Sequence, residues 1–253
     1  MEPILAADRN LIGSYRKLAE HQPGGSGDVR AFGPVSAFRT GIPISLFNGA
    51  LVTAPSLERD VDAALDWLEA GRAPYLLWVH EDLVDPLLEW AARRQLAPRP
   101  WLMPQMVLAP VPQPPAPPPG VAVDLVEDDQ ALATFRQVLA QDGTPRDVAE
   151  RLIARSFAYD ADVRLFVGRL DGRPVATSVA IRTGDVSGVY AVGTLETARR
   201  RGVGTAATWA AIGAGRDWGC SRVVLQSSEM GFPVYRAIGF QTVVRYVLFR
   251  PAP

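Results

Sequence analysis

The sequence predicts an α+β protein whose mixed, mostly antiparallel sheet is flanked by helices. In the second half of the chain, strand-like and helix-like stretches follow one another in the order β-α-α-β-β-β-α-β-α-β. Tight turns such as Asp171-Gly172 join neighbouring strands as hairpins, whereas the helix after Gly202 predicts one parallel crossover. The 48% apolar and 21% charged residues are typical of a folded globular chain.

A proline-rich segment divides the chain. Residues 110–120 contain seven prolines, which lack a backbone donor and push the preceding residue toward extended geometry. The segment can therefore be neither a helix nor a central strand. We expect a semi-rigid surface linker between a domain at residues 1–109 and a second domain at residues 121–253. A proline-rich ligand for a small recognition domain is the alternative.

Each expected element follows from apolar spacing and turn residues. Before the linker we expect strands at residues 35–39 and 45–52, a helix at 57–68, a strand at 75–79, a helix from 85 and a strand at 101–108. After it we expect strands at 121–126, 164–169, 174–181, 186–195 and 222–226, helices at 129–142, 145–157, 203–218 and from 232, and a final pair of strands within 240–249.

Composition excludes several classes of site. The formal net charge of −1 gives no overall attraction for nucleic acid or for an anionic membrane, so we expect neither partner. The single cysteine, Cys220, excludes an internal disulfide and a multi-thiolate metal site, and two histidines are too few for a three-histidine metal site. We expect no bound metal.

We expect a bacterial, cytoplasmic protein. Met1-Glu2-Pro3 opens without a basic leader, and no apolar run approaches the roughly 18 residues that span a membrane. A chain rich in Ala, Gly and Pro that contains one lysine, Lys17, is typical of GC-rich bacterial genomes.

A basic loop containing two glycines precedes the helix at 203–218. Arg199-Arg200-Arg201-Gly202-Val203-Gly204 follows a strand and opens this helix. Helix N-termini offer unpaired N–H groups and partial positive charge, and glycine lets the backbone approach an anion closely. The loop therefore indicates a phosphate site, with a solvated basic turn as the alternative.

Two motifs together resemble the GCN5-related N-acetyltransferase (GNAT) superfamily. The loop fits its (Arg/Gln)-x-x-Gly-x-(Gly/Ala) signature, and Tyr235-Arg236-Ala237-Ile238-Gly239-Phe240 is similar to its Tyr-x-x-x-Gly-Phe ending. The resemblance covers Val121 to about Arg250. Gly202 to Ala207 also match a dinucleotide fingerprint, but that motif needs an acidic residue at the end of the next strand, which here ends in Gln226-Ser227-Ser228.

The resemblance implies that acetyl-CoA, or another acyl-CoA, is the co-substrate and an amine the acceptor. The pyrophosphate of the acyl-CoA would bind to the amides of the loop and of the first helical turn. Its pantetheine would lie along the end of the preceding strand. A bulge there, suited by Gly193, would free an N–H near Val192 for the developing oxyanion. The implied cofactor-binding residues are Val192, Gly193, Thr194, Arg199, Arg200, Arg201, Gly202, Val203, Gly204, Thr205, Ala206, Ser228 and Tyr235.

The resemblance also assigns the proton transfers. Tyr235 would protonate the leaving thiolate, with a core tyrosine as the alternative, and Ser228 would orient cofactor or water unless it is a turn serine. Family members often carry a basic Glu on the fourth strand, where this chain has Val186, Ser187 and Gly188. Glu196 is our candidate base, followed by Asp185 and Glu229; all three are otherwise surface charges. A water chain or an amine of low pKa would need no base.

The order of elements before the linker parallels the order after it but lacks the basic glycine loop. We expect the first half to be a degenerate GNAT copy, with an unrelated α/β domain as the alternative. The predicted function is N-acetylation of a small-molecule or peptide amine; the alternative is a non-catalytic acyl-CoA sensor or interaction module. The acceptor and the oligomeric state, a homodimer included, stay open.

Overall fold

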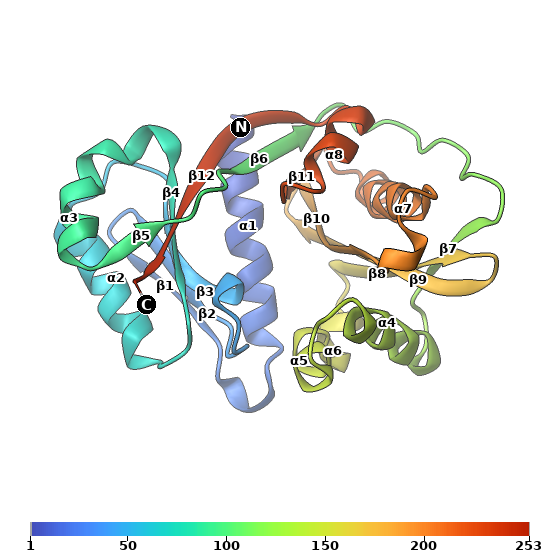
Figure 1. Cartoon of the computed structure of the whole chain (residues 1–253), viewed down its shortest axis with the longest axis horizontal. Helices are drawn as coiled ribbons and strands as arrows, with labels where there is room; N and C mark the ends of the chain where they lie inside the picture. Colours follow the sequence, from blue (N-terminus) through green and yellow to red (C-terminus); the bar gives the residue numbers. More distant parts are fainter. Residues whose placement is uncertain (1, 253) are drawn as a thin grey trace. The chain divides into compact units, whose positions relative to one another are not determined.

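A computed structural model describes residues 2–252 and divides into two compact units (Figure 1). Unit 1 holds the residues up to Met106 and those from Gln226 onward, and unit 2 holds Val107–Leu225. No helix in the described range is both long and apolar enough to cross a membrane.

Unit 2 is a twisted sheet with helices on both faces. Its strands lie in the order β7-β8-β9-β10-β11, antiparallel except for the parallel pair β10 and β11. Figure 1 shows α7 on one face of β8 and β9 and α4, α5 and α6 on the other. The elements are β7 (Val121–Leu125), α4 (Asp129–Gln141), α5 (Arg146–Leu152), α6 (Arg155–Ala158), β8 (Val163–Leu170), β9 (Arg173–Thr183), β10 (Val186–Thr194), the 3-10 turn η5 (Glu196–Ala198), α7 (Val203–Asp217) and β11 (Arg222–Gln226).

Small residues let α7 lie close to this sheet. A Cβ added to Gly215 would stand 2.8 Å from the Ser187 Cβ, so the helix has no room for a side chain there. Nearer its N-terminus, Val203 and Ala207 are fully buried in a cluster with Ala176. The close approach fixes the start of α7 against the beginning of β9 and the end of β10, where the candidate site lies.

Unit 1 contains both termini of the described chain. Its sheet has the order β1-β2-β3-β4-β12, with β5 paired to β12. The elements are α1 (Pro3–Glu20), η1 (Pro23–Gly25), β1 (Asp28–Phe32), β2 (Val35–Arg39), η2 (Ser45–Phe47), β3 (Asn48–Val52), α2 (Glu58–Ala70), β4 (Leu76–His80), η3 (Glu81–Leu83), η4 (Asp85–Leu87), α3 (Leu88–Arg93), β5 (Leu96–Pro98), α8 (Phe232–Ile238) and β12 (Gln241–Pro251). The strand β6 (Met103–Leu108) runs from unit 1 into unit 2 along the chain.

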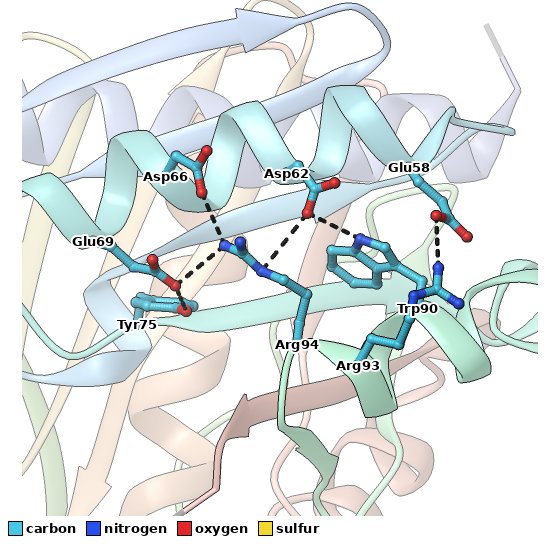
Figure 2. Close-up of polar contacts among 8 residues, drawn as sticks. All are labelled: Glu58, Asp62, Asp66, Glu69, Tyr75, Trp90, Arg93 and Arg94. Carbon is cyan, nitrogen blue, oxygen red and sulfur yellow. Dashed lines mark hydrogen bonds and ion pairs between the residues drawn. The ribbon is translucent and has the colours of Figure 1, made fainter.

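An ionic network holds the short helix α3 on α2 (Figure 2). The Arg94 guanidinium lies 3.0 Å from Asp66, 3.4 Å from Glu69 and 3.7 Å from Asp62. The Trp90 indole N–H donates to Asp62 at 3.0 Å. The neighbouring pair Arg93–Glu58 is 2.7 Å long but largely exposed on both sides. A six-residue helix is not stable alone, so these contacts and the burial of Trp90 keep it formed.

Most expected elements are confirmed. Strands β2 and β11 have the expected bounds, residues 113–120 are exposed without helix or strand, and Asp171 and Gly172 both have positive φ, as a tight hairpin turn requires. The sequence analysis did not predict helix α1 or strands β1 and β5.

Three expectations are wrong in detail. The final pair of strands is the single strand β12, which pairs with both β4 and β5. The helix expected at 145–157 breaks into α5 and α6 at Ile153, whose carbonyl accepts two bonds from the Arg136 guanidinium. Residues Ser45–Phe47 form a 3-10 turn before β3 instead of its first residues.

The compact units also differ from the expected domains. Residues from Gln226 onward cluster with the first half of the chain, because β12 pairs with β4 over Tyr246–Phe249. The division at residues 110–120 stays a prediction about the two family domains.

Candidate active site

The strands β10 and β11 separate before their ends. They pair in parallel only at Val186–Gly188, opposite Arg222–Val224, whereas β10 continues to Thr194 and β11 to Gln226. The outer half of β10 is therefore open on the side of β11. An extended chain can add to such an open edge by main-chain hydrogen bonds.

A bulge lies in this open half of β10. Tyr190 pairs with Val179 and Gly193 with Thr177, so three steps along β10 match two along β9. Ala191 takes up the change with a φ of 47°, and its carbonyl accepts a bond of 2.9 Å from the Thr177 hydroxyl. Ala191 and Val192 are thus left out of the pairing with β9.

The bulge itself was expected, but Gly193 does not provide its left-handed residue. Gly193 has no positive φ and pairs with Thr177 in register. Position 193 requires glycine because there is no room for a side chain: an added Cβ would stand 2.9 Å from the Asp142 Oδ2. Alanine at position 191 therefore carries the strain and glycine at position 193 makes the space.

The N-terminus of α7 lies beside the end of β10. Gly202 caps the helix in a left-handed conformation, with φ of 79°, and within residues 2–252 no side-chain cap bond is made at this end. The first turn contains no acidic residue, and Arg199, Arg200 and Arg201 are exposed before it. This end of the helix suits an anion.

Gly202 and Gly204 are required for different reasons. Gly202 needs glycine for its φ, and an added Cβ would also stand 2.8 Å from the Pro118 Cγ of the proline-rich segment. At Gly204 an added Cβ would stand 2.5 Å from the Thr194 Oγ1. Gly204 therefore permits contact between α7 and β10.

Unit 2 brings most of the predicted cofactor residues together. Val192, Gly193 and Thr194 end β10, residues 199–202 form the loop, and residues 203–206 are the first turn of α7. The Val203 side chain is fully buried in the core beneath the loop, so only its backbone can face a ligand.

One carboxylate was not predicted. Asp142, which follows α4, lies with its Oδ1 3.6 Å from the Arg199 Nη2 and its Oδ2 against Gly193. Arg199 is held in turn by a bond of 3.1 Å from its Nε to the Thr194 carbonyl. Burial raises the pKa of the Asp142 carboxyl, and the positive charge of Arg199 opposes that rise. No short-range pattern in the sequence connects residue 142 with residue 193.

Tyr235 and Ser228 belong to unit 1. The Tyr235 ring packs edge-on against Phe240 and is 9% exposed, and this burial raises its pKa to about 12. No partner of its hydroxyl is found within residues 2–252. The Ser228 hydroxyl accepts a bond of 3.2 Å from the Gly231 N–H, which is the role of a turn serine. Contacts of either residue with a cofactor stay predictions.

The candidate bases named from the sequence are exposed. Glu196 begins the 3-10 turn η5, just past the end of β10. Asp185 lies at the opposite end of β10, where it accepts a bond of 2.8 Å from the Ser221 hydroxyl. Glu229 lies in unit 1.

Comparison with known proteins agrees with this geometry. Residues 120–231 match a family model described as an acetyltransferase (GNAT) domain. No curated protein matches the chain.

Solved structures share the fold at low sequence identity. The GCN5-related N-acetyltransferase from Kribbella flavida has a TM-score of 0.70 and 20% identity, covering 98% of this chain and 96% of its own. The one from Sphaerobacter thermophilus has a TM-score of 0.63 and 18% identity, covering 87% and 78%. A tandem GNAT protein from the clavulanic acid biosynthesis pathway has a TM-score of 0.58 and 14% identity, covering 98% and 97%.

The tandem neighbour is consistent with a degenerate first copy in this chain. Together, the open and bulged strand, the helix start beside it and the family match indicate a GNAT acetyltransferase domain over residues 120–231, and the solved structures share its fold.

Proposed function

We propose that the protein is an N-acetyltransferase that transfers an acetyl group from acetyl-CoA to an amine of a small molecule or peptide by direct attack. One observation carries the proposal. The bulge at Ala191–Val192 lies on the open edge of β10, beside the N-terminus of α7, which follows Gly202 and is preceded by three exposed arginines.

The residues present fit acetyl-CoA as the co-substrate. The amides from Arg201 to Ala206 would bind its pyrophosphate, because the first turn of α7 follows Gly202, which has no side chain to cap its N–H groups. The open edge of β10 from Val192 to Thr194 would bind its pantetheine amides as an added strand. The Val192 N–H, outside the β9 pairing, would donate to the carbonyl oxygen on which negative charge develops, a contact worth roughly 3 kcal/mol.

Tyr235 is our candidate for the acid that protonates the departing thiolate. With a pKa of about 12, its phenol keeps its proton at neutral pH and is available as a donor. We expect Tyr235→Phe to lower kcat while acetyl-CoA affinity is retained, and full turnover in that variant would contradict the role.

Calorimetry with acetyl-CoA tests the anion site. We choose the double variant Arg200→Gly with Arg201→Ala. Glycine is used at position 200 because residue 200 has a φ of 60°, which glycine adopts without strain. Each exposed charge contributes on the order of 1 kcal/mol, so the double variant should bind roughly 10- to 30-fold more weakly.

Arg216→Ala is the matched control. Like Arg201, Arg216 is exposed and pairs with an aspartate, at 3.6 Å from Asp217, but it lies at the other end of α7. Affinity unchanged in the double variant, or lowered equally in the control, would contradict the site.

A non-catalytic acyl-CoA sensor is the second candidate. Val186, Ser187 and Gly188 stand where many family members carry a basic carboxylate, which favours this alternative. Release of CoA in the steady state with a panel of amines distinguishes the two, because a sensor would bind acetyl-CoA without turnover.

A further inference from the structure

The backbone around Asp142 is fixed by the way α4 ends. Asp142 is the helix C-cap, and Gly143 follows with a φ of 100°. The Gly143 N–H donates to the Ala140 carbonyl and the Thr144 N–H to the Leu139 carbonyl, the bonds of a Schellman motif. Residue 142 is therefore held in one place, on the face of the sheet opposite α7.

The Asp142 carboxylate faces the bulged end of β10. Its Oδ2 occupies the space that a side chain on Gly193 would need, one residue beyond Val192. Its Oδ1 lies 3.6 Å from the Arg199 Nη2, which is beyond hydrogen-bond distance. The side chain is 28% exposed, so water and a ligand can reach it.

The bonding of this carboxylate is unlike that of a structural aspartate. Within residues 2–252 the carboxylate accepts no hydrogen bond, whereas Asp162 and Asp129 each accept short bonds from arginines. Arg199 is the charged group that interacts electrostatically with the Asp142 carboxylate. Its guanidinium also donates a hydrogen bond to the Thr194 carbonyl. Partial burial without a hydrogen bond raises the pKa of the Asp142 carboxyl and makes it a better proton acceptor than a solvated carboxylate.

We propose that Asp142 is the general base of the acetyl transfer, taking a proton from the acceptor amine directly or through one water. This inference rests on the proposed function. It places the base on the loop after α4 instead of on the strand itself, and it is preferred to Glu196 because that side chain is exposed.

The protons and bonds balance. An alkylammonium acceptor gives one proton to the Asp142 carboxylate, which later releases it to solvent. The freed nitrogen attacks the thioester carbonyl carbon; the carbon–nitrogen bond forms and the carbon–sulfur bond breaks. The sulfur leaves as a thiolate and takes one proton, from Tyr235 in our proposal, and the second nitrogen proton restores the donor. The products are the N-acetyl amide, CoA as the thiol and one proton.

Asp142→Asn tests the base with two acceptors of different basicity. Benzylamine is protonated at neutral pH and aniline is not, so only the first needs a base. We expect the variant to lose about 100-fold or more in kcat/KM for benzylamine and less than about 10-fold for aniline. The acid limb of the pH profile with benzylamine should move in the variant from the pKa of the carboxyl to the higher pKa of the amine, because only the unprotonated amine then reacts.

Asp217→Asn is the matched control, since Asp217 is an exposed aspartate of the same unit, paired with Arg164 at 3.2 Å. Equal losses with both amines in Asp142→Asn would show a structural role and overturn the proposal. The same upward move of the acid limb in Glu196→Gln, and not in Asp142→Asn, would assign the base to Glu196 and also overturn the proposal.

Carbon-13 NMR of the acetyl-CoA complex gives a readout that needs no acceptor. We expect the Asp142 carboxyl to titrate above its ordinary value, and titration at or below that value would overturn its assignment as base. A wild-type protein that binds acetyl-CoA but releases CoA with none of a panel of alkyl- and arylamines would contradict the proposed function instead, so the two failures are distinguishable.

Discussion

Burial sets the ionisation of two tyrosines in unit 1. It raises the pKa of Tyr235 from 10.0 to about 12, and it also raises that of Tyr75, whose hydroxyl donates to Glu69. The folded protein therefore holds these protons more tightly than the unfolded chain. The contribution of these two protonated tyrosines to the free energy of unfolding is fully present below about pH 10. It is lost as the pH rises through their pKa values in the folded protein.

We expect Tyr235→Phe to remove part of this alkaline loss. Between about pH 9 and about pH 11 the free energy of unfolding of the wild type should fall by on the order of 1 kcal/mol more than that of the variant. Urea unfolding at the two pH values measures it. Identical pH dependence in both proteins would contradict the burial of this phenol.

Most of the candidate cofactor residues could be selected from the sequence because they lie close together along the chain. Arg199 to Gly204 form a dense signature, and the structure gives Gly202 the left-handed φ that such a motif needs. Asp142 could not be predicted in the same way. Its chemistry depends on contact with Gly193 and Arg199, which folding alone brings near it.

At the scale of elements, the network between α2 and α3 is open to a direct test (Figure 2). The Arg94 side chain is 29% exposed and lies among three carboxylates, whereas Arg93 has one exposed partner. Removing Arg94 leaves like charges facing one another on α2. We expect Arg94→Ala to destabilise unit 1 by about 1–2 kcal/mol, and Arg93→Ala by less than about 0.5 kcal/mol.

Urea unfolding of both variants at low and high salt checks this difference. The effect of Arg94→Ala should shrink at high salt, because screening weakens interactions between charges near the surface. Equal effects of the two substitutions would show that the network does not act as a unit.

Elements with a simple pattern could be predicted, and those that depend on tertiary pairing could not. Strand β11 is an apolar run between turn residues and was predicted to its ends. Helix α1 was missed, although Pro3 in its first turn and buried Ala7, Leu11 and Leu18 on one face are a readable signal. The unbroken course of β12 depends on its partners β4 and β5, which local sequence does not show.

At the scale of the whole molecule, the two units repeat one order of elements but not the site. In the described part of unit 1, β2 pairs with β3 without a bulge, and β3 pairs with β4 through Val52, its last residue. The crossover helix α2 begins with Glu58 and Asp60, which repel an anion at the position where α7 has no acidic residue. Within the described residues, the first half therefore keeps the order of elements without the bulge and the helix start that we expect to bind a diphosphate.

We expect one acetyl-CoA to bind per chain. Calorimetry with the chain of residues 1–253 gives the stoichiometry, and Arg200→Gly combined with Arg201→Ala should weaken that single binding event. Binding of two acetyl-CoA molecules per chain at equivalent sites would contradict the interpretation of the first half as a degenerate copy.

Strand β12 has a consequence for synthesis on the ribosome. Tyr246 bonds to Asp8 of α1, 238 residues earlier, and the same strand covers the edge of β4. A nascent chain emerges from its N-terminus, so the first half must wait, with an uncovered sheet edge, until β12 has been synthesised. Premature termination before residue 241 would leave that edge exposed in every product, a hazard for aggregation that the finished protein does not have.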